Sequence, residues 1–455
     1  MLKQLLVSSA LLMSFLVKAD LYQATQLYQQ QKYQEAKREF EQLLPLGNEM
    51  AAFNLAVMAM NAQGMEQDLP RSYSYYLVAD KLGHPNARRG ISYLDSVLSA
   101  EQKQQAQQQA DAWQQTFVPS LESSIKARLQ SKVDNADKIY RRSITRVEPK
   151  YPKAAARKLT QGFAVVRLLV NEHGSVDYAK TQHSFPPGVF AETSEHALKQ
   201  WRYEATGQKS IVVVTMDFGL TIPAHDMKSW RYNLTKALEK DYWPGAVAGV
   251  ALHQYYNAIL LNYLSRSSDN RIDFSTTATK LPELADFPAS SAQALEMQAF
   301  DGKAEFSLDQ HHKLSKVVVF SGEVPLTAGQ VFSSTLKAGD YFIAPWDLNF
   351  GTDKPPVYAK DKMYVKPLHY VPKEWSSAFW EDQAARNGLL EAQRARAQFD
   401  RGWASYLRQK NDPVALGWHA IELLTEQKSN EAKAVFKQAQ AAGFEATPEL
   451  EVLFQ

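Results

Sequence analysis

Histidine, carboxylate and cysteine side chains carry most protein chemistry, and their spacing in this chain predicts little of it. His311 and His312 form the only adjacent pair among 10 histidines. Neighbouring residues on a strand point to opposite faces, so this pair does not predict a shared metal ion. The sequence contains no Gly-rich phosphate loop, no His-Glu-x-x-His zinc motif and no Gly-x-Ser-x-Gly nucleophile elbow. We therefore predict no catalytic residue and no metal site.

The chain has no cysteine. This excludes disulfides, thiolate nucleophiles, Cys-ligated zinc and lipoprotein acylation. We expect a protein that is not an enzyme, binds no cofactor, and is held together by its hydrophobic cores alone.

The bulk composition is that of a folded globular protein. The 455 residues are 45% hydrophobic and 22% charged, with a net charge of +2. This length predicts two to four domains. The near-neutral charge gives no indication of a nucleic-acid partner, and we expect none.

The first residues have the pattern of a secretory signal peptide. Lys3 supplies a positive start, Leu5 to Val17 an apolar run, and Val17-Lys18-Ala19 a small-residue cleavage site. The apolar run is short for a membrane span of roughly 20 residues. We predict that the signal is cleaved and that the mature protein begins near Asp20, in the periplasm of a Gram-negative cell. The alternative is a retained N-terminal anchor.

Both ends of the chain contain repeated helical sequences. The segment from Glu35 to Gly47 matches the segment from Glu431 to Gly443 at Glu, Ala, Lys, Phe, Gln and Gly positions 396 residues apart. Alanine at a close-packing position, Phe on the buried face and Gly after the helix end are typical of a helical hairpin. The match resembles the second helix of a tetratricopeptide repeat. The segment from Ala51 to Ala87, with a turn from Gly64 to Asp68, resembles a Sel1-like repeat.

A Tyr-Pro pair opens a different kind of segment in the middle of the chain. After Tyr151-Pro152 come a short cationic helix, Gly162, and alternating residues on either side of a turn at Gly174, which predict a β-hairpin. A helix then leads to Trp201-Arg202-Tyr203, and Ser210 to Ile222 predicts a last strand.

This order, with its Tyr-Pro, Gly and Trp-Arg-Tyr residues, resembles the C-terminal domain of the TonB family. In that family the last strand is an exposed edge, to which an outer-membrane transporter adds an extended segment. The resemblance implies β-augmentation, in which backbone amides supply affinity and flanking side chains select the partner. The partner-binding residues that it implies are Tyr151, Pro152, Ile211, Val212, Val213, Val214, Thr215 and Met216. Gly162, Gly174, Trp201 and Tyr203 are expected to be structural.

A second, diverged copy of this domain is predicted from Phe287-Pro288 onward. Gly302, Ala304, Phe306 and Leu308 follow the pattern of the first copy, and Met363 to Val371 supplies a candidate last strand. An unrelated β-hairpin insertion is the alternative.

The predicted fold class is therefore an α+β multidomain protein, with helical solenoid segments of the tetratricopeptide or Sel1 type around one or two small TonB-like ββαβ domains. The predicted boundaries are 1–19 for the signal peptide, 20–118 for helical repeats, 119–137 for a linker helix, 138–223 for the TonB-like domain, 224–280 for a helical segment, 281–372 for the second copy, 373–449 for C-terminal repeats and 450–455 for a remnant that resembles a viral 3C protease site.

The functional hypothesis is a periplasmic adaptor that grips an extended segment of an outer-membrane or envelope protein and holds a second partner on its helical repeats. One alternative is a structural subunit of an envelope secretion or surface-assembly machine. Another is an envelope-surface protein whose basic module binds peptidoglycan. A TonB-type energy transducer is the remaining alternative. It requires an uncleaved N-terminal anchor to couple it to the inner membrane, and the long Pro-Lys and Pro-Glu spacer of that family is not found in this sequence.

Overall fold

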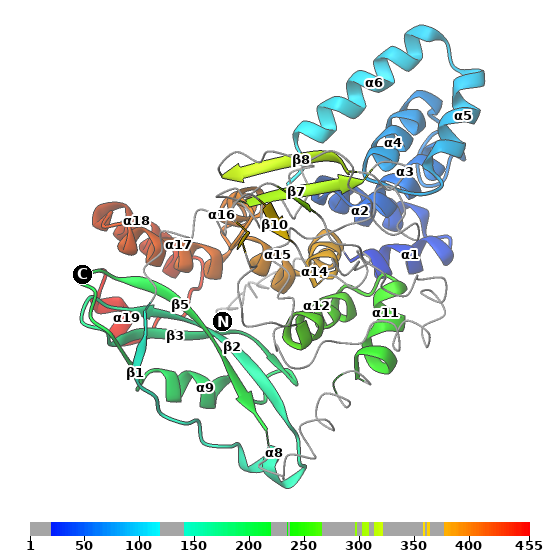
Figure 1. Cartoon of the computed structure of the whole chain (residues 1–455). Helices are drawn as coiled ribbons and strands as arrows, with labels where there is room; N and C mark the ends of the chain where they lie inside the picture. Colours follow the sequence, from blue (N-terminus) through cyan, green and yellow to red (C-terminus); the bar gives the residue numbers. More distant parts are fainter. Residues whose placement is uncertain are drawn as a thin grey trace, which may run out of the picture. The chain divides into compact units, whose positions relative to one another are not determined.

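The structure is a computed structural model that mixes helices with small sheets (Figure 1). It describes residues 20–118, 141–219, 234, 237–265 and 377–455, together with the strand segments 296–297, 303–308, 314–321, 358–359 and 362–364. The chain divides into two compact units. Unit 1 comprises residues 1–115 with 387–389, and unit 2 comprises residues 116–386 with 390–455.

Unit 1 is helical throughout its described residues. Its helices are α1 (Leu21–Gln29), α2 (Tyr33–Leu43), η1 (Leu44–Leu46), α3 (Glu49–Met60), α4 (Leu69–Lys81), α5 (Ala87–Val97) and α6 (Ala100–Gln115). Consecutive helices pack as hairpins, α1 with α2 and α3 with α4. Small residues of α3 allow the close approach of α4, whose Ser72 Oγ donates to the Ala56 carbonyl at 2.8 Å. At Gly64, with φ of +67°, an added Cβ would collide with the Tyr33 backbone.

The two sequence segments that match 396 residues apart fold in the same way. They form α2 in unit 1 and α18 (Ser429–Ala441) in unit 2. Ala36 and Ala432 are both fully buried, and Phe40 and Phe436 are 0% and 4% exposed. Gly47 and Gly443 both have positive φ just beyond the helices. The predicted helical hairpins are therefore present, while their assignment to the tetratricopeptide or Sel1 class stays a prediction.

Unit 2 is built on a three-stranded antiparallel sheet with the order β3-β2-β5. Its strands are β2 (Gly162–Val170), β3 (Val176–Phe185) and β5 (Ser210–Phe218). The helix α8 (Lys153–Arg157) precedes β2, and α9 (Ala191–Leu198) follows β3. This is the predicted order of helix, strand, strand, helix and strand. A short ribbon pairs β1 (Ser143–Thr145) with β4 (Arg202–Tyr203), and the sequence did not predict it.

One face of this sheet is closed by α9 and the segments around it. Even-numbered residues of β2, from Ala164 to Val170, form a core with Phe190, Leu198 and Trp201. Gly162 is required where β2 begins, because an added Cβ would meet the Phe185 carbonyl oxygen and the Phe190 ring. Gly174 turns the hairpin with φ of +87°, and an added Cβ there would meet the Tyr203 carbonyl.

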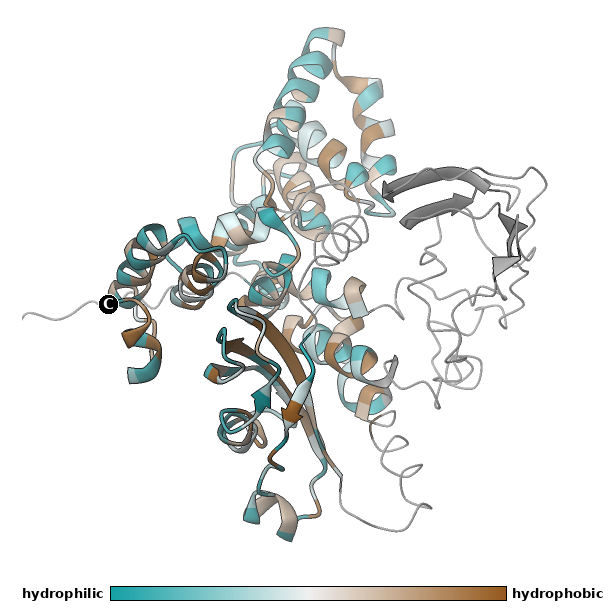
Figure 2. Ribbon diagram, turned by 60° about the vertical axis from the view of Figure 1, so that its left-hand side comes forward, coloured by the Kyte–Doolittle hydropathy of each residue, from teal (hydrophilic) through white to brown (hydrophobic). Residues whose placement is uncertain are grey.

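The other face of the sheet is covered by helices from two later parts of the chain. Leu169 and Tyr178 pack in one core with residues of α17 (Pro413–Thr425), α18 and α19 (Pro448–Val452). Phe163 stacks on Tyr263 of α12 (Ala251–Ser265) with 4.0 Å between ring centroids. Every residue of β2 is therefore buried, and Figure 2 shows the hydrophobic colour along the strands of this sheet.

The remaining described helices of unit 2 are η2 (Leu238–Tyr242), α11 (Trp243–Val247), α14 (Ser377–Arg386), α15 (Leu390–Arg396) and α16 (Arg401–Gln409). Within the terminal segment predicted as a protease-site remnant, Leu450 and Phe454 are buried, and Phe454 stacks on Phe436. The origin of this segment stays a prediction. Among the described residues, no helix is long and apolar enough to span a bilayer.

Part of the predicted second copy is described. A hairpin joins β7 (Lys303–Leu308) to β8 (Leu314–Ser321), as expected for that segment. The strand β10 (Lys362–Tyr364) pairs with β6 (Glu296–Met297) and β9 (Tyr358–Ala359) in a separate sheet. The second copy stays a prediction, because most of residues 281–372 lie outside the described residues. The predicted signal peptide and linker helix also lie outside them.

Trp201 provides a direct test of the core beneath α9. Its side chain is 8% exposed, and its Nε1 donates to the Val147 carbonyl at 3.0 Å. We call the sheet with its two helices, residues 143–218, the β-domain. Trp201→Ala should destabilise it by about 3–5 kcal/mol through lost burial and the cavity left behind. Chemical unfolding of the full chain, followed by circular dichroism, measures this loss.

The matched control is Gln200→Ala at the preceding, exposed position, which should change stability by less than about 0.5 kcal/mol. Equal stabilities for the Trp201→Ala protein and this control would show that Trp201 is not part of the core.

Candidate partner-binding edge

The strand β5 pairs along its whole length with β2 and occupies the edge of the sheet. The register is continuous from Gly162 opposite Phe218 to Val170 opposite Ser210. On its other side, no strand among the described residues pairs with β5.

The register also shows which amides of β5 face outward. The Asn171 amide, directly after β2, donates to the Ser175 carbonyl at 2.9 Å, on the side of β3. Backbone groups of a strand point alternately to its two neighbours. The Val166 backbone therefore faces β5, where its partner is Val214.

It follows that every second residue of β5 directs its backbone groups toward β2: Ser210, Val212, Val214, Met216 and Phe218. The intervening residues, Ile211, Val213 and Asp217 among them, direct theirs to the open side. Such an edge is a template for an added strand.

Side chains of β5 divide between the two faces of the sheet. Val212, Val214 and Met216 point into the core beneath α9. Ile211 packs against the C-terminal helices, and Thr215 is half-buried. Val213 is 49% exposed. Of the six β5 residues predicted from the sequence, Val212, Val214 and Met216 therefore contribute their side chains to the protein's own core and their backbone groups to the pairing with β2. The backbone groups that can meet a partner belong to the residues between them.

The Tyr151-Pro152 pair lies at the end of β5. The Tyr151 hydroxyl donates to the Thr160 carbonyl at 2.6 Å, and its ring contacts Phe190 and Phe218 edge-on. Pro152 precedes the first turn of α8 in extended conformation. Tyr151 thus makes structural contacts at the end of β5, while Pro152 directly precedes α8.

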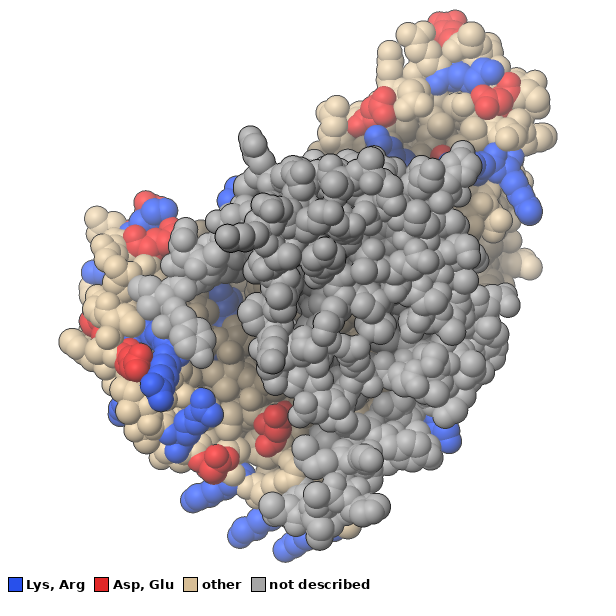
Figure 3. Space-filling view, in the orientation of Figure 1, with Lys and Arg blue, Asp and Glu red and all other residues tan. Residues whose placement is uncertain are grey.

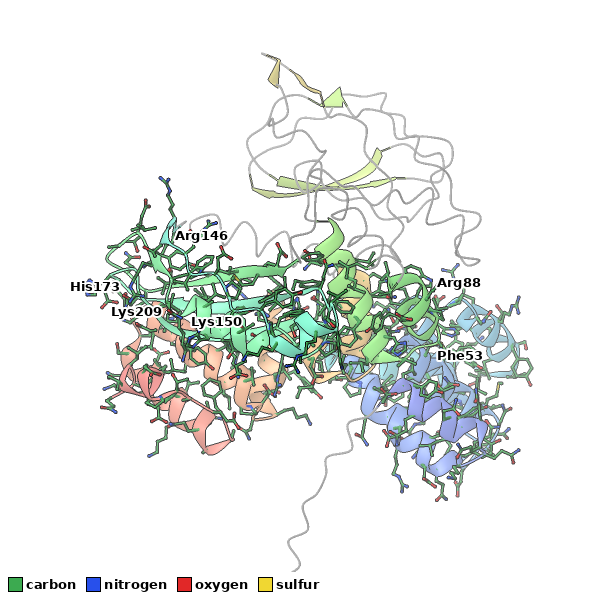
Figure 4. The ribbon with its side chains drawn as sticks, turned by 90° about the horizontal axis from the view of Figure 1, so that it is seen from below. Phe53, Arg88, Arg146, Lys150, His173 and Lys209 are labelled. Carbon is green, nitrogen blue, oxygen red and sulfur yellow. The ribbon has the colours of Figure 1, made fainter. Side chains whose placement is uncertain are left out.

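The surface around this domain is basic. Residues 138–222 contain 13 Lys or Arg and 7 Asp or Glu. The exposed cations near the Tyr-Pro segment are Lys150, Lys153, Arg157 and Lys158. Figure 3 shows Lys and Arg side chains along the margin of the β-domain where α8 lies. Figure 4 labels Lys150 and Arg146 on the same domain, with His173 and Lys209 at one end of it.

One charge cluster of unit 2, on the second face of the sheet, is Arg167 with Trp418 and Glu422. Arg167 lies in the middle of β2 and is 8% exposed. Its guanidinium lies 4.1 Å from the Trp418 ring centroid, and its Nη2 donates to Glu422 Oε1 at 2.8 Å. This cluster was not predicted from the sequence. The one available signal was an arginine inside the otherwise apolar run from Phe163 to Val170.

Glu422 has a strongly displaced pKa. Partial burial alone would raise the pKa, but His419, whose Nδ1 lies 3.7 Å from Glu422 Oε2, and the positive charge of Arg167 lower it from 4.5 to about 2. The carboxylate is therefore ionised at neutral pH and neutralises the buried guanidinium. Among the described residues, no group of His, Asp or Glu side chains could hold a metal ion.

Comparison with known protein families identifies part of this unit. The family described as Gram-negative bacterial TonB protein C-terminal matches residues 147–221, which include α8, the three-stranded sheet and α9. No curated protein matches the chain. That family is a non-enzymatic protein-interaction domain, and the match suggests an envelope-related protein–protein interaction.

The Glu422 carboxylate gives a prediction of pH dependence. Its folded pKa lies below the ordinary value of 4.5, so the unfolded chain binds more protons than the folded one as the pH falls. The stability that it supplies is complete above about pH 4.5 and is lost as the pH falls toward about 2. In thermal melts across this window, Glu422→Gln should show a weaker pH dependence than the unchanged protein.

The control for that measurement is Glu431→Gln, because Glu431 is exposed at the start of α18. It should retain the original pH dependence. If Glu422→Gln and Glu431→Gln have the same pH profile, the Arg167–Glu422 pair does not stabilise the packing of α17 on the sheet.

Proposed function

We propose that this protein is a non-enzymatic adaptor of the Gram-negative cell envelope, which binds an extended segment of an outer-membrane or other envelope protein by strand addition to β5. The open edge of β5, with outward amides at Ile211 and Val213, supports this mode most directly. Main-chain hydrogen bonds would give the affinity, and side chains on the two faces would select the partner.

The charge of the domain favours a particular kind of segment. Its excess of six positive charges, 13 against 7 between residues 138 and 222, would attract an acidic segment and speed its association. Tyr151 and Pro152 are proposed to flank the added strand rather than to provide its main contacts.

The helical hairpins supply a second proposed role. A hairpin of this kind cannot bury its own apolar face, and neighbouring hairpins stack into extended surfaces that bind other proteins. We place a second partner on the hairpins of residues 20–118, so that the protein links two components of the envelope.

A structural subunit of a secretion or surface-assembly machine remains the second candidate. It differs in having the β5 edge paired permanently. Hydrogen exchange of the outward β5 amides in the isolated protein distinguishes the two functions. It should be fast for an adaptor and slow for a permanently paired edge.

Two proline substitutions in adjacent residues test strand addition. Proline removes an amide donor and is tolerated in a sheet only where that donor is not needed. Val212→Pro should unfold the β-domain, because the Val212 backbone faces β2. Val213→Pro should leave the fold intact and abolish binding of peptides selected from a displayed random library. Val213→Thr keeps both the amide and the branched shape, so it should retain binding that Val213→Pro loses.

Hydrogen exchange gives the independent control. In the isolated protein the Ile211 and Val213 amides should exchange fast and the Val212 and Val214 amides slowly, and a selected peptide should slow the first pair. Slow exchange at Ile211 and Val213 before any peptide is added would contradict the adaptor and favour a permanently paired edge.

The proposed periplasmic location rests on cleavage before Asp20. Asp20 is the N-cap of α1, since its side chain accepts a hydrogen bond from the Gln23 amide at 3.0 Å, so the predicted cleavage site directly precedes folded structure. N-terminal sequencing of the protein from periplasmic extract should begin at or near Asp20. A chain that begins at Met1 in the membrane fraction would support the anchored transducer instead.

A further inference from the structure

A cavity of about 500 Å³ lies within unit 2, between the second face of the sheet and the C-terminal helices. Strand addition itself does not require this cavity, because the outward amides of β5 lie along the edge of the sheet and the cavity lies over one face of it. The sheet contributes Val165, Arg167 and Val213 to its lining. The cavity thus reaches the exposed edge strand itself.

The register of the sheet relates this cavity to any added strand. Lys180, Arg167 and Val213 lie opposite one another across β3, β2 and β5, and all three line the cavity. Residues directly opposite in neighbouring strands point to the same face. The residue of an added strand that pairs with Val213 therefore continues this row, about 4.8 Å beyond β5, and points its side chain to the cavity side.

Helix α17 forms the wall opposite the sheet. Its residues in the cavity recur at helical spacing and lie on one side of the helix: Val414, Ala415, Trp418, His419 and Glu422. The other side of α17 packs on α18 through buried residues such as Leu416 and Ile421. The cavity wall is therefore held in place by a hydrophobic core behind it.

The chemistry of this lining favours an aromatic occupant. Arg167 presents a planar guanidinium whose one face is covered by the Trp418 ring, and its charge is balanced by Glu422 at 2.8 Å. Guanidinium planes stack on aromatic rings. Val165, Val213 and Ala415 supply apolar surface beside it.

Charge alone would not select the occupant. The lining carries Lys180 and Arg408 but also Glu391 and Glu381, so neither sign of charge is favoured. The volume falls in the range of sites that hold small organic groups, which accommodates a ring.

We propose that this cavity is a specificity pocket for one aromatic side chain of the bound segment, located at the residue that pairs with Val213. The proposal rests on the proposed function, since strand addition to β5 is what delivers the side chain. The matched β-domain supplies the edge, and helices α15 to α17, which lie outside residues 147–221, supply the selectivity.

The test uses the full chain and a displayed library of random eight-residue peptides. Selected peptides should carry Phe, Tyr or Trp at one fixed position, and alanine at that position should weaken binding tenfold or more, as expected for a buried aromatic anchor. Ala415→Phe fills the cavity with a new ring. This variant should bind the aromatic and the alanine peptide equally, with the affinity that the unchanged protein has for the alanine peptide.

The matched control is Ala434→Phe, which adds the same ring at an exposed position of α18, and it should keep the tenfold preference. Residual binding of the alanine peptide to Ala415→Phe verifies that this variant is folded and that its edge is intact.

The outcomes separate the two proposals. Peptides that lose binding with Val213→Pro but show no aromatic position, or whose aromatic preference survives Ala415→Phe, would overturn the specificity pocket and leave strand addition standing. Failure to select any peptide, or selection that is insensitive to Val213→Pro, would overturn strand addition and the pocket with it.

Discussion

The burial of β2 on both faces is the constraint on which the rest of unit 2 depends. All nine residues from Gly162 to Val170 are buried, and a strand in that position needs a layer on each side and a neighbour on each edge. The layers are α9 on one face and the helices α12 and α17 to α19 on the other. The edges are occupied by β3 and β5. Since β2 uses one side of β5, the other side of β5 is left as the edge of the sheet.

Arg167 is the exception within this apolar strand, and its environment explains how it is accommodated. A guanidinium in a protein interior is costly unless it is paired and its donors are satisfied. Glu422 supplies the opposite charge and Trp418 the stacking surface. Such a pair stabilises less than a hydrophobic contact of the same volume would, and it lies on the side of α17 that faces the sheet. The α17 residues that line the cavity lie on this same side.

The open edge of β5 is a hazard as well as a binding site. An exposed strand with outward amides can pair with other copies of the chain. Val213 is half exposed on this strand, while residues 138–222 carry 13 Lys or Arg against 7 Asp or Glu. Like charges on two copies repel, and an acidic segment is attracted. The same charge can therefore oppose self-association and favour the proposed partner.

The sequence by itself determined the local architecture of the β-domain. The Tyr-Pro pair, the two glycines and the alternation of apolar residues specify a helix, a hairpin, a second helix and a last strand, because turn geometry and side-chain period are properties of short segments. The burial of Trp201 and the helical hairpins at Ala36, Phe40, Ala432 and Phe436 followed from the same local patterns. The short ribbon of β1 and β4 was missed, since three and two residues give too little pattern.

Only the tertiary structure decided what covers the second face of the sheet. Arg167 and Glu422 are 255 positions apart, and Phe163 and Tyr263 meet from separate segments. No local period links such residues, because their contact depends on how whole layers pack. The apolar run of β2, broken only by Arg167, carried a hint of burial on two faces, but it could not name the helices that provide it. The cavity beside Val213 arises from that packing, and for this reason the sequence predicted the edge strand but not the pocket next to it.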